Sequence, residues 1–171
     1  MLQIEPCCTQ KHLLALRSKL GENGTAFWHG YGDLSLAELL PHILTRYSET
    51  EMLLAVPALP DAAAETVKNI MQKQWMRMDG KGKLNVVKHL TLVADLRKKK
   101  SPAANGWLTE NPFGDRLTIR NVQQGDTAIL LPDIAFFGNI NLSYGNHFTA
   151  IATKHKKLID EMRKNFLMLN A

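Results

Sequence analysis

The alternation of strand-like and helix-like segments constrains this chain more than any other feature. Residues 51–56 form a continuous apolar run of strand length, as expected for a strand that is buried on both faces. Pro60 follows, and proline suits the first turn of a helix. A strand followed by a helix, repeated along the chain, is typical of α/β folds. We therefore predict an α/β fold with a mixed, mainly parallel sheet flanked by helices.

Apolar spacing and turn residues place the other elements. A short helix is expected to run to about His89, directly before a strand. Pro132 and Asp133 form a tight turn between two strands, which predicts a β-hairpin. Predicted strands cover residues 25–29, 51–56, 90–96, 116–122, 127–131, 134–137 and 147–153. Predicted helices cover residues 9–20, 36–47, 60–78 and 154–169, and one helical turn is expected near Trp107. The last two of these helices carry apolar stripes at Val67, Ile70, Met71, Gln74 and Met78, and at Leu158, Ile159, Met162, Phe166 and Leu169.

Length and composition predict one domain over residues 1–171. The longest apolar run is far shorter than a membrane span, and the first residues do not resemble a secretory signal. We expect a cytoplasmic protein without a membrane partner. Cys7 and Cys8 are adjacent and are the only cysteines, which excludes a disulfide scaffold and a thiolate zinc site. No metal or other cofactor is predicted.

The chain is basic, with a formal net charge of +5. Four consecutive cations, Arg97, Lys98, Lys99 and Lys100, follow a predicted strand and cannot be buried. We call them the tetrabasic segment. Such a segment can hold phosphates by releasing counter-ions, so DNA or RNA is a candidate partner. The alternative is an ordinary solvated loop.

A glycine-rich loop after the first long predicted strand supplies the catalytic candidates. His29, Tyr31 and Asp33 bring an acid/base group, a hydrogen-bonding ring and a carboxylate into one short stretch between glycines. With His147, which begins a later strand, His29 and Asp33 are the candidate catalytic residues. The alternative is a solvated turn. The common phosphate-loop, dinucleotide and nucleophile-elbow motifs do not occur in the sequence.

The C-terminal third carries a resemblance. A strand leads into a hairpin, then a glycine-centred turn, a strand and a terminal helix, and the turn contains Gly138, Asn139 and Asn141. This order resembles one unit of the phospholipase D-like phosphodiesterases. That family has a His-x-Lys-x4-Asp strand followed by a Gly-Ser-x-Asn turn, and here Asn139 takes the place of serine. The resemblance implies a single-unit chain that works as a homodimer.

The match fails at the catalytic residues of that family. Its histidine would fall near residues 124–126, where this chain has glutamine, glycine and aspartate, and Thr127 and Ala128 occupy the following places. Asp133 stands near the family's aspartate. Without an imidazole, no group can attack phosphorus. The resemblance therefore predicts a catalytically silent domain that binds nucleic acid or another phosphate-bearing partner. An active hydrolase built around His29 and Asp33 and a protein-interaction domain remain the alternatives.

Overall fold

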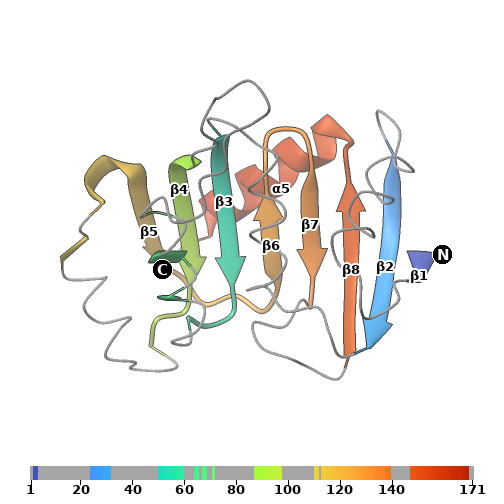
Figure 1. The fold of residues 1–171 in the computed structure, drawn as a ribbon, viewed down its shortest axis with the longest axis horizontal. Coiled ribbons are helices and arrows are strands. Elements are labelled where there is room, and N and C mark those ends of the chain that lie inside the picture. Colours follow the sequence, from blue (N-terminus) through green and yellow to red (C-terminus); the bar gives the residue numbers. More distant parts are fainter. Residues whose placement is uncertain are drawn as a thin grey trace, which may run out of the picture.

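The computed structural model describes residues 2–3, 24–31, 50–59, 64, 65, 67, 68, 71, 87–97, 110, 111, 113–139 and 147–169. They form one eight-stranded sheet with the strand order β1-β2-β8-β7-β6-β3-β4-β5, and α5 crosses behind it in Figure 1. The elements are β1 (Leu2–Gln3), β2 (Thr25–Tyr31), β3 (Thr50–Val56), β4 (Val87–Ala94), η1 (Gly114–Arg116), β5 (Leu117–Asn121), β6 (Thr127–Leu130), β7 (Ala135–Gly138), β8 (His147–Thr153) and α5 (Lys156–Met168).

The sheet is mixed, as predicted. Six of the eight described strands run in one direction, and only β6 and β8 oppose them. Because β6 and β8 lie between other strands, four of the seven neighbouring pairs are antiparallel and three are parallel. The hairpin of β6 and β7 is confirmed, and the Leu131 amide donates to the Ile134 carbonyl at 2.9 Å across its turn.

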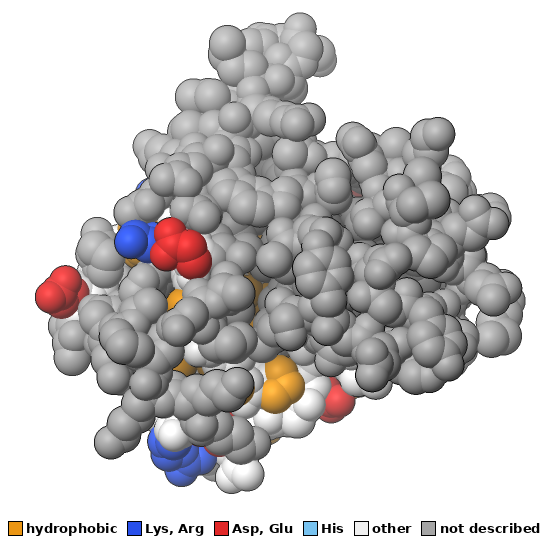
Figure 2. Space-filling view, turned by 60° about the horizontal axis from the view of Figure 1, so that its bottom comes forward, with side chains coloured by type: hydrophobic (Ala, Val, Ile, Leu, Met, Phe, Trp, Pro, Cys, Tyr) orange, Lys and Arg blue, Asp and Glu red, His pale blue; other side chains and the backbone are white. Residues whose placement is uncertain are grey.

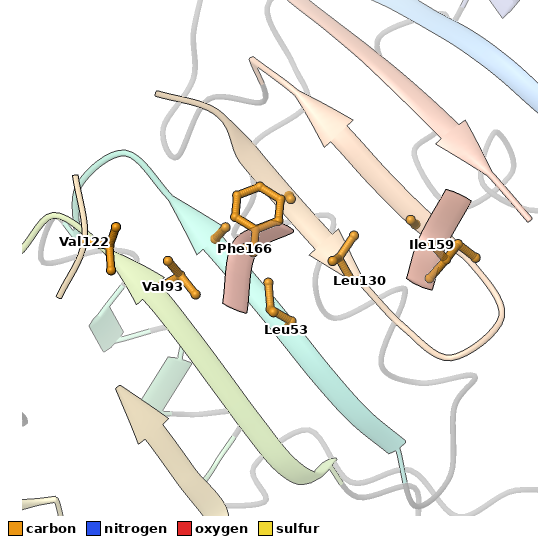
Figure 3. Close-up of a cluster of buried hydrophobic side chains, with 9 residues drawn as sticks. Leu53, Val93, Val122, Leu130, Ile159 and Phe166 are labelled. Carbon is orange, nitrogen blue, oxygen red and sulfur yellow. The ribbon is translucent and has the colours of Figure 1, made fainter. Parts of the chain in front are cut away.

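Alternate residues of the central strands face opposite sides of the sheet, and both sides are buried. Leu53 and Ala55 of β3 belong to the cluster beneath α5, whereas Met52 and Leu54 are equally buried and lie outside it. This double burial explains the continuous apolar run of β3. The cluster beneath α5 is drawn in Figure 3 and contains Leu53, Ala55, Val93, Val122, Ala128, Leu130, Ala135, Ile159 and Phe166.

Helix α5 is capped at both of its ends, and its C-terminal end is also joined to the sheet. At its start, the exposed His155 caps the helix, and its Nδ1 accepts a hydrogen bond from the Leu158 amide at 3.4 Å. At its end, the Arg120 guanidinium of β5 donates to the carbonyls of Leu167 and Leu169. The last turn of α5 has no basic residue of its own. Arg120 therefore supplies the positive charge that helix C-termini favour.

Replacing Arg120 with alanine should lower the free energy of unfolding by about 1–2 kcal/mol, because two helix carbonyls lose a charged donor. Urea unfolding followed by circular dichroism measures this change. Arg163→Ala is the matched control, since Arg163 has the same charge and lies on α5 itself. An equal loss in both variants would contradict the capping role.

The predicted boundary at His89 is wrong. His89 lies inside β4, which begins at Val87 and pairs with β3 from there. The ring of His89 is held at the β5 side, with Nδ1 2.8 Å from the Asp115 carbonyl and Nε2 3.0 Å from Thr118 Oγ1. These contacts come from residues 26 and 29 positions later in the chain. They satisfy a polar ring within the strand, and no local pattern reveals them.

Two helix predictions have mixed outcomes. Leu158 was expected in the inner stripe of the last helix but is 37% exposed, because the face that packs on the sheet is centred on Ile159 and Phe166. In the predicted helix over residues 60–78, residues 64, 65, 67, 68 and 71 are helical, and Val67 and Met71 are buried as expected. The predicted helices over 9–20 and 36–47, the turn near Trp107, and Ile70, Gln74 and Met78 lie outside the described residues.

Candidate functional site

The strands that share one direction bring several chain segments to the same edge of the sheet. Strands β2, β3, β4, β5 and β7 end there, and β6 and β8 begin there, at the lower edge in Figure 1. We call this the carboxyl edge. Ligands of open α/β sheets gather beyond the carboxyl ends of the strands. This edge is therefore the place to look for a site.

Two of the predicted site segments lie at the carboxyl edge. Gly138 ends β7, and Arg97 lies three residues beyond the end of β4. Strands β6 and β3 separate β7 from β4, so the two strand ends lie about 14 Å apart at roughly 4.8 Å per strand. Gly138 has φ 150°, a conformation that favours glycine, and Asn139 beside it is exposed. Asn141, Lys98, Lys99 and Lys100 lie outside the described residues.

The two candidate histidines occupy neighbouring strands at the same edge. In the register of β2 and β8, Tyr31 pairs with His147 and His29 pairs with Thr149. His29 and His147 are therefore diagonal neighbours, which places them about 7–8 Å apart. Asp33 lies outside the described residues. The structure thus brings the backbone positions of two of the three candidates together.

A buried carboxylate fixes the start of the tetrabasic segment. The backbone amide and Nε of Arg97 both lie 3.1 Å from Asp95 Oδ1. The side chain of Asp95 is 3% exposed, whereas that of Arg97 is 65% exposed. A buried carboxylate must be compensated by donors, so Asp95 holds the exposed arginine in one position. The expectation that Arg97 is solvated is confirmed.

The neighbouring loop reinforces this arrangement. The Leu96 amide donates to Asn121 Oδ1 at 3.1 Å, and the Val122 amide donates to the Ala94 carbonyl at 3.0 Å. The loop between β5 and β6 therefore continues the sheet contacts beside residues 94–97. In Figure 2, with the carboxyl edge turned forward, one blue group of Lys or Arg atoms lies beside a red acidic group, and another blue group lies apart at the lower rim.

Comparisons with known proteins identify the fold. No protein-family model and no curated protein matches the sequence. Among solved structures, NucT from Helicobacter pylori matches with a TM-score of 0.55 and 11% identity, over 86% of this chain and 96% of NucT. Nuc from Salmonella typhimurium, a phospholipase D family member, matches with a TM-score of 0.51 and 17% identity, over 84% of this chain and 92% of Nuc.

The chain has a phospholipase D-like fold. This confirms the resemblance that the strand order and the Gly138 turn predicted. Polyphosphate kinase from Porphyromonas gingivalis contains a similar unit, with a TM-score of 0.60 and 14% identity. The match covers 99% of this chain and 30% of the kinase, so the chain spans less than a third of that protein.

Within the phospholipase D-like fold, the stretch where the catalytic histidine is expected lies in the loop before β6. Gln124 and Asp126 occupy this loop, and Gln124 Oε1 accepts a hydrogen bond from the Asp126 amide at 2.9 Å. Thr127 and Ala128, at the start of β6, are buried. Residues 124–128 contain neither an imidazole nor an ammonium group. Among the described residues, no three His, Cys, Asp or Glu side chains are grouped to hold a metal ion.

Two features of the site were missed at the level of sequence. Asp95 is an acid directly after a buried strand and two residues before an arginine, and this Asp-x-Arg spacing was a readable signal. Gln124 lines a cavity together with α5, β7 and β8, and no sequence signal links those distant segments.

No described helix of the phospholipase D-like chain is both long and apolar enough to cross a membrane.

Proposed function

We propose that this phospholipase D-like domain is catalytically silent and binds nucleic acid or another phosphate-bearing partner at its carboxyl edge. One observation carries the proposal: the exposed Arg97 is held by the buried Asp95 at the carboxyl end of β4. Lys98, Lys99 and Lys100 follow directly in the chain. An arginine that is restrained by Asp95 and followed by three lysines gives phosphates a group of cations whose first member has a fixed position.

The residues before β6 support the absence of catalysis. Phosphodiester cleavage through a covalent intermediate needs a nucleophile and an acid for the leaving oxygen. Residues 124–126 offer amide and carboxylate groups instead, and the side chain of Ala128 cannot hold a phosphate. In this proposal the fold serves to bind phosphates at its carboxyl edge and does not cleave them. Relatives of this fold that are named for phospholipase D and polyphosphate kinase activities support phosphate recognition as the common property. As part of the same proposal, the chain acts as a homodimer in the cytoplasm.

A salt titration of oligonucleotide binding tests the function. We expect a fluorescently labelled single strand to bind, with log K falling against log salt concentration with a slope of about −3 if four cations contact phosphates. Affinity should then fall roughly 50-fold between about 50 and 200 mM salt. Fluorescence anisotropy measures both quantities. An absence of binding at low salt would remove the nucleic-acid part of the proposal.

The position of His29 and His147 favours a second candidate function, a hydrolase with its site at β2 and β8. The two residues are diagonal neighbours at the carboxyl edge, and Asp33 follows two residues after the end of β2. Hydrolysis of bis-nitrophenyl phosphate separates the two functions. Turnover by the wild type that disappears in the His29→Ala variant would favour the hydrolase. Background rates in both proteins would favour the silent domain.

A further inference from the structure

An imidazole and a hydroxyl are paired at the edge of the sheet opposite to the carboxyl edge. Strands β4 and β5 both begin there, at the upper edge in Figure 1. His89 lies near the start of β4 and Thr118 near the start of β5, and Nε2 of the ring is 3.0 Å from Oγ1 of the threonine. Thr118 is exposed and His89 is half-buried, so the hydroxyl can be reached from solvent. Neither residue has a role in the function proposed above.

The backbone fixes which nitrogen of His89 carries the proton. Nδ1 lies 2.8 Å from the carbonyl oxygen of Asp115, and a carbonyl can only accept a hydrogen bond. Nδ1 therefore carries the hydrogen, and in the neutral ring Nε2 has the free lone pair. The Thr118 hydroxyl then donates to Nε2. A hydroxyl that donates to an imidazole, which is itself oriented by a third group, is the arrangement that activates serine and threonine as nucleophiles.

The turn that supplies the Asp115 carbonyl is itself tied to both strands. Nδ2 of Asn111 donates to the Leu117 carbonyl at 3.2 Å, which joins the chain before the turn to the start of β5. The Arg116 guanidinium donates to the Val87 carbonyl at 3.0 Å, which joins the turn to the start of β4. The hydroxyl, the ring and the carbonyl are therefore held by secondary structure and by a pinned turn. Such preorganisation is what a base-activated nucleophile requires.

The surrounding charges narrow the class of group that Thr118 can accept. Glu51 of β3 pairs with His89 in the sheet register and is exposed, so a carboxylate lies on the same face beside the ring. The guanidinium groups of Arg116 and Arg120 already donate to backbone carbonyls. A negatively charged phosphoryl donor would meet the carboxylate and gain nothing from either arginine. An uncharged acyl donor meets neither obstacle.

We propose that Thr118 is a site of covalent acylation, with His89 as its general base and an uncharged ester or thioester as the acyl donor. Oγ1 of Thr118 attacks the carbonyl carbon of the donor while its proton passes to Nε2 of His89. The bond from that carbon to the leaving oxygen or sulfur then breaks, and His89 returns the proton to the leaving group. The products are acylated Thr118 and a free alcohol or thiol. Acylation of one hydroxyl is independent of phosphate binding at the carboxyl edge and leaves the domain silent as a phosphodiesterase.

Reaction of the full chain with p-nitrophenyl acetate, an uncharged activated ester, tests the inference. Peptide mass mapping at early times should find the acetyl group on Thr118 and not on Thr91, which lies opposite it in the register of β4 and β5. In His89→Gln the rate of acetylation at Thr118 should fall about 100-fold, the lower end of the range for general base catalysis. Thr118→Ser keeps the hydroxyl and should still be acetylated at this position. Thr91→Val is the matched control and should keep the wild-type rate.

Two comparisons decide the outcome. If Thr118 of the wild type is acetylated no faster than the other threonines, the inference fails whether or not the variants fold. If His89→Gln keeps the circular-dichroism spectrum and also the acetylation rate of the wild type, His89 is not the base and the inference fails as well. A slower reaction in His89→Gln, together with an unchanged one in Thr91→Val, supports an activated hydroxyl. Nucleic-acid binding is measured separately, so its failure would remove the proposed function and leave this result standing.

Discussion

Phe166→Ala should lower the free energy of unfolding by about 3–5 kcal/mol, the range measured for large aromatic residues removed from protein cores. Phe166 is 8% exposed and belongs to the buried cluster beneath α5, together with Leu53 of β3 and Val93 of β4. Its ring also contacts Phe137. Truncating Phe166 leaves a void between α5 and the sheet, and the strands of the sheet are too rigid to move in and fill it. Denaturant unfolding followed by circular dichroism measures the change.

Met168→Ala is the matched control for this prediction. Met168 lies two residues further along α5 and is 63% exposed, so its truncation should change the stability by less than about 0.5 kcal/mol. A comparable loss in both variants would mean that the side of α5 facing the sheet is different from the one described. A loss confined to Phe166→Ala would support the helix orientation, which also forms one wall of the cavity.

The strands were predictable from sequence where burial is simple. β3 lies in the middle of the sheet and is buried on both faces. Its continuous apolar run was therefore enough to predict a strand. β4 was harder, because its first residues include Lys88 and His89, which are polar. Pairing with β3 and contacts from Asp115 and Thr118 hold these residues in the strand. Those contacts depend on the tertiary fold, which a local pattern does not contain.

The sequence was enough to predict where the candidate site lies on the sheet, but not all of the residues that form it. Charge and position after a strand were enough to predict an exposed Arg97 at a sheet edge. The Asp-x-Arg spacing was a readable signal for the contact between Asp95 and Arg97, but the burial of Asp95 was not predictable, because nothing in the sequence requires an acid beside four cations to be buried. Its burial follows from the packing around the end of β4, where Asn121 and Val122 close over the strand. The cavity at Gln124 depends on α5, which lies more than thirty residues further along the chain.

Replacing Lys98, Lys99 and Lys100 with glutamine should weaken single-strand binding roughly 10- to 100-fold at low salt. The slope of log K against log salt should become shallower by about 2 units, because each lysine that no longer meets a phosphate removes about 0.7 of a unit. Arg97 is kept in this variant, since its loss would leave the buried Asp95 without its guanidinium partner and confuse binding with stability. Anisotropy titrations at several salt concentrations measure both changes.

The matched control removes the same charge from the other end of the sheet. Lys154, Lys156 and Lys157 lie between the end of β8 and the first turn of α5, at the edge opposite to Arg97, and their replacement is the α5 variant. Either triple variant lowers the net charge from +5 to +2, a difference of three. If only overall charge attracts the nucleic acid, both variants weaken binding equally, and the carboxyl edge has no special part in it. If Asp95 and Arg97 direct the strand to this edge, the α5 variant keeps most of the affinity and of the salt slope. A larger loss in the α5 variant would move the binding surface to the helix.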